Sequence, residues 1–221
     1  MTSRRSPSSS ETKQRLVDGV LETIRRHGIT AVSARTVATA AGANQALIFY
    51  HFGSVEELVA QACIGATEER VAGYRERFAA VGTVGELLEL GREVHEGERA
   101  EGNLAVLAQA LAGAQAGGRL AEATREALDK WVTEVRAALE RVLAGSPMAD
   151  LVDPDGLAHA VSAGFLGLTL FESVDPEGGR RALDALDRLA SLVDVVEGLG
   201  PVATRAVRAR LRKAGRGRDG K

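Results

Sequence analysis

Side chains that can read and anchor DNA are concentrated in residues 33–52 of the chain. The amide of Gln45 can pair with the edge of an adenine, and the guanidinium of Arg35 can make a bidentate contact with a guanine. Tyr50 and His51 are suited to phosphate oxygens, which position a protein on the duplex. Apolar residues could touch thymine methyl groups, and the residues that begin each helix could contact phosphates. The full predicted DNA-binding set is Ser33, Arg35, Thr36, Asn44, Gln45, Ala46, Leu47, Phe49, Tyr50 and His51.

Two short helices joined by a tight turn are predicted to carry these residues. Ser33 can cap the first helix, and Gly42 allows the turn because left-handed backbone costs glycine little. Asn44 is a favourable N-cap for the second helix. We expect Leu47, Ile48 and Phe52 to face the core, and Gln45, Ala46, Phe49 and Tyr50 to face outward. The pattern predicts a helix-turn-helix, which places its second helix in the major groove of DNA.

Apolar residues recur at helical spacing along most of the chain, and no long segment alternates in the manner of a strand. The sequence therefore predicts an all-α protein of about nine helices. Glycine and proline, such as Gly117-Gly118 and Pro176, mark expected breaks between them. The expected helices are 11–27, 33–41, 44–52, 54–80, 83–98, 103–116, 120–144, 154–173 and 179–197.

Charge divides the chain into three parts. Residues 1–53 hold seven Lys/Arg and three Asp/Glu, a net charge of +4. Residues 54–204 hold 13 Lys/Arg and 26 Asp/Glu, a net charge of −13. Residues 205–221 hold eight Lys/Arg and one Asp/Glu, a net charge of +7. A basic head on an acidic body is typical of a DNA-binding module attached to a domain with a different task. We expect a disordered arm at 1–10, a helix-turn-helix domain at 11–56, a larger helical domain at 57–200 joined to it through the fourth helix, and a basic, partly disordered tail at 201–221.

Several classes of protein are disfavoured by what the chain lacks. Cys63 is the only cysteine, so no internal disulfide can form, and a reducing cytoplasm is the expected location. No run of 18 or more apolar residues predicts a membrane span. The four histidines, His27, His51, His95 and His159, do not have the spacing of a metal site. No nucleophile or phosphate-loop motif is found either, so we expect no enzyme, no metal and no cofactor.

The residues from Thr30 to Leu58 resemble the TetR family of bacterial transcription repressors. The matching segments are Thr30-Ala31-Val32-Ser33, Val37-Ala38, Ala41-Gly42-Ala43-Asn44 and Ile48-Phe49-Tyr50-His51-Phe52-Gly53-Ser54-Val55-Glu56-Glu57-Leu58. The resemblance covers about residues 11–60. It implies a homodimer that binds a pseudo-palindromic operator and leaves it when a small-molecule effector binds the body. The chain departs from the family at Ala46, Phe49 and Val55, where glycine or proline, tyrosine and lysine are usual.

The body is expected to enclose an apolar cavity, which in the resembled family receives the effector. Its candidate wall residues, each also suited to plain core packing, are Tyr74, Phe78, Leu107, Leu111, Trp131, His159 and Phe165. Small residues four apart and an apolar stripe near heptad spacing predict a dimer interface of four helices, two from each chain. The candidate interface residues are Ala160, Gly164, Gly167, Leu183, Leu186, Ala190 and Val193.

Two questions stay open at the level of sequence. The head could have lost its ability to read DNA, which would leave a helical interaction protein; Val55 and the acidic body favour this alternative. The basic tail could contact DNA non-specifically or pair with the acidic body, although a solvated tail is favoured. The expected partners are an operator in double-stranded DNA, an unidentified small-molecule effector and a second copy of the chain, with no membrane.

Overall fold

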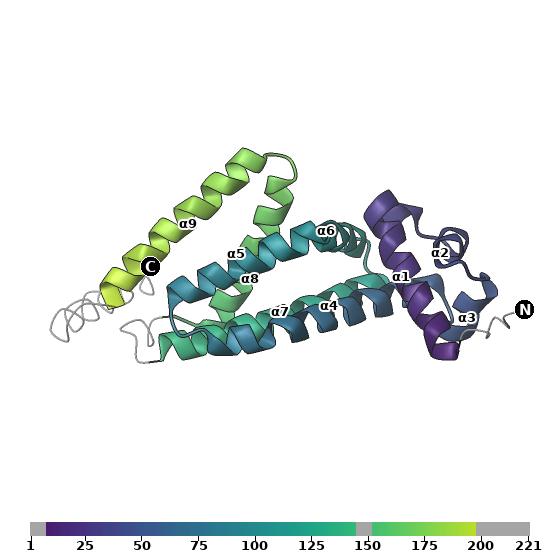
Figure 1. Cartoon of the computed structure of the whole chain (residues 1–221), viewed down its shortest axis with the longest axis horizontal. Coiled ribbons are helices and arrows are strands. Elements are labelled where there is room, and N and C mark those ends of the chain that lie inside the picture. Colours follow the sequence, from purple (N-terminus) through teal and green to yellow (C-terminus); the bar gives the residue numbers. More distant parts are fainter. Residues whose placement is uncertain (1–7, 145–151, 198–221) are drawn as a thin grey trace, which may run out of the picture. The chain divides into compact units, whose positions relative to one another are not determined.

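The computed structural model describes residues 8–144 and 152–197 of the chain (Figure 1). Within these ranges it has nine α-helices, one short 3-10 helix and no strand, which confirms the all-α prediction. The elements are α1 (Ser9–His27), η1 (Ile29–Ala31), α2 (Ala34–Ala41), α3 (Ala46–Phe52), α4 (Val55–Ala80), α5 (Val84–Ala100), α6 (Asn103–Ala114), α7 (Gly118–Leu143), α8 (Pro154–Glu172) and α9 (Pro176–Glu197).

Capping side chains determine where the first helices begin. The Ser8 hydroxyl accepts the backbone N–H of Glu11, and the Glu11 carboxylate accepts the backbone N–H of Ser8. This reciprocal pair starts α1 at Ser9, so residues 9 and 10 belong to the helix rather than to the expected arm. The rest of the expected arm, residues 1–7, and the basic tail 201–221 lie outside the described residues.

The last two helices both begin at an Asp-Pro pair. The Asp175 carboxylate accepts a backbone N–H at 2.9 Å, and Pro176 takes the first position of α9, where its missing N–H costs nothing. Asp153 and Pro154 open α8 in the same way. The expected start of α9 at residue 179 was therefore three residues late, because Pro176 begins α9 as well as separating it from α8.

The chain divides into two compact units. The first comprises residues 1–72 and 98–130, and the second comprises residues 73–97 and 131–221. The helices α4, α5 and α7 each contribute residues to both units. The predicted helix-turn-helix domain at 11–56 lies wholly in the first unit, which also contains α6 and the first half of α7.

The core of the first unit is built around α1. The fully buried side chains of Leu16, Val20 and Ile24 belong to one apolar cluster with Val37 of α2 and Ile48 of α3. Residues of α4 and α6 complete this cluster. In the same unit α4 and α7 are joined by an ion pair of 2.9 Å between the Arg119 guanidinium and the Glu57 carboxylate, which holds the pKa of Glu57 below its usual value.

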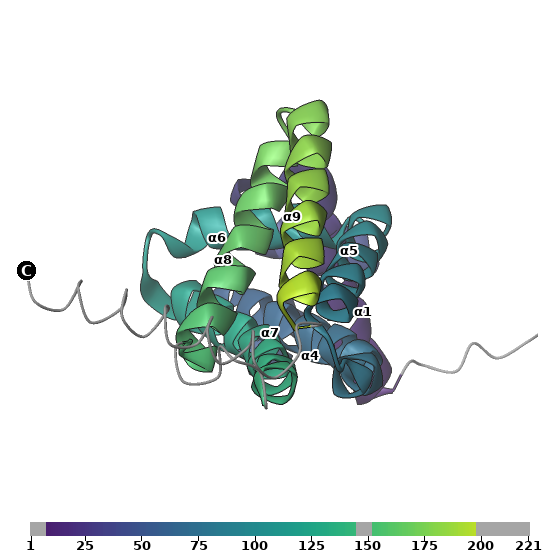
Figure 2. The same cartoon turned by 90° about the vertical axis from the view of Figure 1, so that its left-hand side faces the viewer.

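The core of the second unit is a separate apolar cluster formed by α5, α7, α8 and the end of α4. Its buried members include Phe78, Leu90, Val94, Val135 and Leu139. The helices α8 and α9 run side by side in this unit, as Figure 2 shows. Most of α8 is exposed or half-buried, and Ala158 is its buried residue.

Candidate nucleic-acid interface and ligand site

The turn between α2 and α3 is held by its own backbone and by one side chain. Gly42 has φ 58° and ψ 41°, the left-handed conformation that the turn requires. The Asn44 side-chain oxygen then accepts the backbone N–H of Ala46 at 2.9 Å. The N-cap position of α3 is nevertheless Gln45, one residue later than predicted, and the helix is seven residues long.

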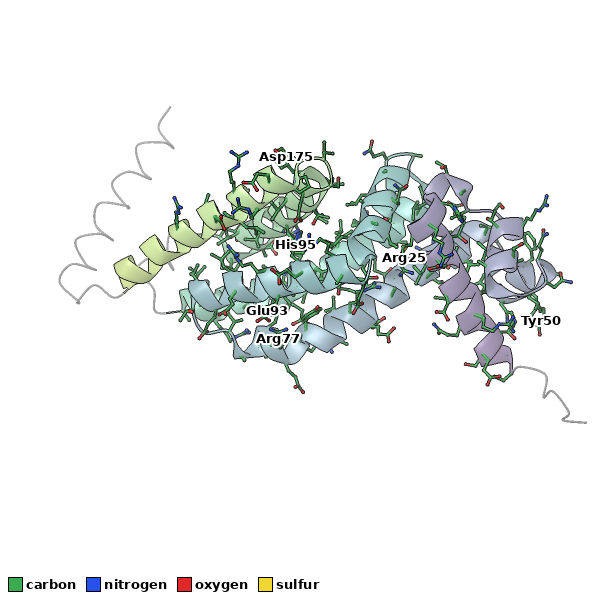
Figure 3. All side chains as sticks on the ribbon, turned by 45° about the horizontal axis from the view of Figure 1, so that its top comes forward. Arg25, Tyr50, Arg77, Glu93, His95 and Asp175 are labelled. Atoms are coloured by element: carbon green, nitrogen blue, oxygen red, sulfur yellow. The ribbon has the colours of Figure 1, made fainter. Side chains whose placement is uncertain are left out.

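One face of α3 is buried and the opposite face is open to solvent. Ile48 is 0% exposed and Phe52 is 8% exposed, whereas Phe49 is 53% exposed and Tyr50 is 80% exposed. Figure 3 shows Tyr50 projecting outward from the first unit. Gln45 and Ala46 are also exposed, as predicted. The exposed face of such a helix can contact a groove of DNA, while the buried face fixes the helix to the core of the first unit.

Two predicted DNA-binding residues of α3 are partly covered. Leu47 is half-buried and packs against the core cluster of the first unit, which agrees with its predicted inward orientation. The imidazole of His51 is half-buried, with its ring centroid 4.9 Å from that of Tyr50 and 6.4 Å from that of Phe52. His51 therefore sits at the edge of the exposed face.

The hydroxyl groups at the start of α2 form hydrogen bonds with the backbone at the start of that helix. Thr36 Oγ1 donates to the carbonyl of Ala31 at 2.8 Å and accepts the backbone N–H of Ser33 at 2.9 Å. The Ser33 hydroxyl accepts the backbone N–H of Thr36. The proton of Thr36 is thereby used within the chain, so its hydroxyl is not a free donor for phosphate. Arg35, between them, is exposed.

Arg15 was missed by sequence reasoning and supports the motif from α1. Its guanidinium donates to the carbonyl oxygen of Ala41 at 2.6 and 3.1 Å and to that of Gly42. These bonds satisfy carbonyl groups at the end of α2, which have no partner within the helix. Arg15 therefore fixes the turn to α1 and is a positioning residue of the site.

The predicted pocket residues divide between the two units. Tyr74, Phe78, Trp131 and Phe165 gather in the core cluster of the second unit, with ring centroids of Tyr74 and Phe78 lying 5.9 and 6.4 Å from that of Trp131. Leu107 and Leu111 are half-buried residues of the first unit.

His159 is also set apart from the aromatic cluster. Its side chain is 58% exposed, and its Nδ1 lies 2.9 Å from the carbonyl oxygen of Asp155 on the same helix. Of the seven predicted wall residues, the structure therefore brings four, Trp131 included, together in the core cluster of the second unit.

A buried polar pair beside this aromatic cluster was missed as well. His95 of α5 is 2% exposed, and its Nε2 lies 2.5 Å from Oε2 of Glu172 on α8. The ring of Phe165 packs edge-on against the imidazole at 5.4 Å between centroids. The only sequence signal was a histidine within an apolar-striped helix, which does not reveal a partner 77 residues away.

An exposed apolar face runs along α8. The predicted dimer residues Ala160, Gly164 and Gly167 are exposed, and a Cβ atom at either glycine would meet nothing within 4 Å. Phe171, which sequence reasoning did not select, continues this line four residues beyond Gly167 and is also exposed. Val161 and Leu170 are exposed on opposite sides of the helix, since they are nine residues apart.

The predicted interface residues of α9 are described less fully. Leu186 is 44% exposed and Leu183 is half-buried. The side chains of Ala190 and Val193 lie outside the described residues.

Two kinds of site find no support in the part of the chain that the structure describes. No helix there is both long and apolar enough to cross a membrane. No cluster of three or more His, Cys, Asp or Glu side chains there could hold a metal ion. Burial raises the pKa of the Cys63 thiol to about 11, which keeps this cysteine protonated and unreactive near neutral pH.

Comparison with known proteins connects this geometry to a family. Residues 16–62 match the family model described as bacterial regulatory proteins, tetR family. No curated protein matches the chain.

Several solved structures share the fold. A structure described as a TetR-family transcriptional regulator from Rhodococcus sp. superposes with a TM-score of 0.68 at 21% identity, covering 82% of this chain and 98% of that one. The regulatory protein TetR from Rhodobacter sphaeroides has a TM-score of 0.66 at 18% identity, covering 80% and 97%. The multidrug binding protein EbrR, solved with imidazole, has a TM-score of 0.56 at 22% identity, covering 82% and 96%.

These two comparisons carry different information. At identities of 16–23% the solved structures show a shared fold and nothing about ligands or operators. The match over residues 16–62 spans α1 to the first turns of α4, and thus includes the exposed face of α3 and the turn that Arg15 supports. The helix-turn-helix domain of this chain is therefore similar to that of the bacterial regulatory proteins of the tetR family.

Proposed function

We propose that the protein is a repressor that binds a pseudo-palindromic DNA operator as a homodimer and is released by a small-molecule effector. The observation that carries this proposal is the exposed face at α3, which includes Gln45, Phe49 and Tyr50. The opposite face of the helix is buried through Ile48 and Phe52. A helix so presented fits the major groove, and its polar side chains can reach base edges and phosphates.

Dimer formation is supported by the apolar face of α8. Phe171 is 55% exposed and Leu170 is 48% exposed, beside a line of small residues that would let another helix approach closely. One short helix buries little surface on DNA, and two copies related by a two-fold axis would read half-sites spaced by a helical turn, about 10 base pairs, or a multiple of it. A monomeric mass at micromolar concentration would contradict this part of the proposal.

Release by an effector is supported by the continuity of α4. This helix begins beside α3 in the first unit and ends among the aromatic residues of the second unit. A molecule bound near Trp131 would favour one conformation of the second unit, and α4 would carry the change to α3. EbrR, of the same fold, was solved with imidazole, which is consistent with a small-molecule site.

The decisive experiment is a binding titration with DNA from upstream of the protein's own gene and with a randomised duplex library. Sequence-specific binding should weaken steeply as salt rises, since released counterions contribute to the affinity. Arg35→Ala should relax preference at one base pair and cost about 1–3 kcal/mol. The alternative, a helical interaction protein that no longer reads DNA, predicts no preferred sequence in the library.

A further inference from the structure

Five Lys or Arg side chains belong to residues 8–53, the described part of the basic head. Three of them are engaged within the first unit. Arg15 donates to carbonyl oxygens at the end of α2, and Arg25 and Arg26 pair with a carboxylate of their own helix. Lys13 and Arg35 are both exposed, and neither has a carboxylate partner among the described residues. Arg35 already has a predicted task as a base reader, whereas Lys13 has none.

Lys13 lies over the last residue of α3. Its Nζ is 5.9 Å from the ring centroid of Phe52, within the distance at which a cation is attracted to the face of an aromatic ring. The Phe52 ring lies next to that of His51, which in turn packs edge-on against Tyr50. Figures 1 and 3 show α3 and its Tyr50 beside the beginning of α1, the helix that carries Lys13. The ammonium group therefore lies at the end of α3 that carries Tyr50 and His51.

No carboxylate of α1 is placed to neutralise Lys13. The Glu11 carboxylate caps the start of the helix, and that of Asp18 accepts a hydrogen bond from the side-chain amide of Gln14. The charge of Lys13 is therefore oriented by the Phe52 ring and remains available to an anion outside the described chain. Its neighbours on the helix surface, three and four positions away, are Ser9, Ser10, Leu16 and Val17.

The start of α4, which follows α3 closely, supplies no second free cation. Its first turn holds Glu56 and Glu57. Arg119 is bound to both, because its backbone N–H donates to Glu56 at 3.0 Å and its guanidinium donates to Glu57 at 2.9 Å. Within the described residues, Lys13 is thus the unpaired cation at this end of the helix-turn-helix.

We propose that Lys13 binds a phosphate group of the DNA backbone, and so anchors the end of α3 to one strand without reading its sequence. This inference rests on the proposed binding of DNA through α3. A lysine ammonium is a compact point charge that suits a phosphate oxygen, whereas the planar guanidinium of Arg35 suits the two acceptors of a guanine edge. The two free cations of the head therefore have different tasks, with Lys13 contributing affinity and Arg35 contributing specificity.

Titrations of Lys13→Gln with two duplexes test this assignment in the full chain by fluorescence anisotropy. One duplex carries the sequence that the wild type selects from the upstream region of its gene or from a randomised library, and the other has a random sequence. The variant should lose about three- to tenfold in affinity for both duplexes at constant salt. The slope of log affinity against log salt should become shallower by about 0.9, the counterion release expected for one phosphate contact.

Arg26→Gln is the matched control, because it removes the same charge from the same helix. The Arg26 side chain is 70% exposed and is paired with Glu22, so its charge is already compensated. This variant should keep the salt slope and bind both duplexes within about twofold of the wild type. Lys13→Arg should also keep the slope, since it retains the positive charge. Both Gln variants change exposed side chains, and thermal melting should show that both fold.

Three outcomes would overturn the assignment. They are an unchanged salt slope for Lys13→Gln, an equal loss of affinity in Arg26→Gln, and a loss confined to the selected sequence, which would mean that Lys13 reads a base. A wild type that selects no sequence would remove the proposed operator, but the random duplex would still test Lys13 through its salt slope. Conversely, sequence-specific binding that Lys13→Gln leaves unchanged would retain the proposed function and lose this contact. A wild type that binds neither duplex would contradict both.

Discussion

The side-chain oxygen of Gln109 accepts a hydrogen bond from the backbone N–H of Ile29 at 3.2 Å, across 80 residues of sequence. Gln109 lies on α6, and Ile29 begins the short helix between α1 and α2. Val106 and Ala110 of α6 are buried in the same cluster as the helices of the head. The helix-turn-helix is therefore supported by α6, which begins 51 positions after α3 ends.

Gln109→Met should weaken this support while keeping the volume of the side chain. The N–H of Ile29 is partly buried and would lose its acceptor, so the free energy of unfolding should fall by about 1–2 kcal/mol. Urea denaturation at a fixed protein concentration measures the change. Gln115→Met, at an exposed position just after α6, is the control and should leave stability within about 0.5 kcal/mol of the wild type. Equal stability of the two variants would show that the bond contributes nothing.

Gly19→Ala should destabilise the head by overpacking. A Cβ atom at Gly19 would lie 3.0 Å from both the Cβ and the backbone nitrogen of Ala41, closer than α1 and α2 can accommodate without moving apart. The expected loss in the free energy of unfolding is about 1–3 kcal/mol. At Gly65 of α4 a Cβ would meet nothing within 4 Å, so Gly65→Ala should instead stabilise the helix by about 0.5–1 kcal/mol. Thermal or urea unfolding should therefore show a lower free energy of unfolding for Gly19→Ala and a higher one for Gly65→Ala. Changes of the same sign would contradict the prediction.

Tyr50→Phe should lower affinity for operator DNA without altering stability. The Tyr50 side chain is 80% exposed, so its hydroxyl contributes nothing to the core, but it can donate to a phosphate oxygen. We expect a loss of about three- to tenfold in affinity, measured by fluorescence anisotropy at constant salt. Tyr74→Phe, at the other tyrosine of the chain, removes a hydroxyl in the second unit and should leave operator affinity in the absence of effector unchanged. If the two variants bind operator equally well, Tyr50 makes no phosphate contact.

The buried carboxyl of Glu98 should give the protein a measurable pH dependence. Burial raises its pKa above the ordinary value of 4.5, against the opposing effect of the Arg70 guanidinium. The native state therefore holds this proton more tightly than the unfolded chain does. The contribution of Glu98 to stability consequently falls as pH rises from 4.5 through the raised pKa.

Glu98→Gln removes this titration. The difference in unfolding free energy between the two proteins should shift in favour of the variant as pH rises from about 4 to about 7. Urea unfolding at several pH values measures it. A difference that stays constant, or that shifts in favour of the wild type, would show that the carboxyl is ionised as readily in the native state as in the unfolded chain.

Local pattern was sufficient to predict the all-α class and the arrangement of the helix-turn-helix. The Ser33–Thr36 cap, the left-handed Gly42 and the hydrogen bond from Ala46 to Asn44 each involve residues within a few positions of one another. The division of α3 into a buried face and an exposed one follows from the period of the helix alone. Such features depend on short-range geometry, which the order of residue types expresses directly.

Only the tertiary structure decided which helix faces meet. The bonds of Arg15 to Ala41, of Gln109 to Ile29 and of His95 to Glu172 join residues 26, 80 and 77 positions apart. The periodicity of the sequence does not identify these partners. An apolar stripe indicates that one face of a helix is buried, but it does not indicate which other helix covers that face. For the same reason the sequence could place His95 within a helix, while packing against α8 determined that its ring would be buried with one nitrogen paired and the other free of a partner among the described residues.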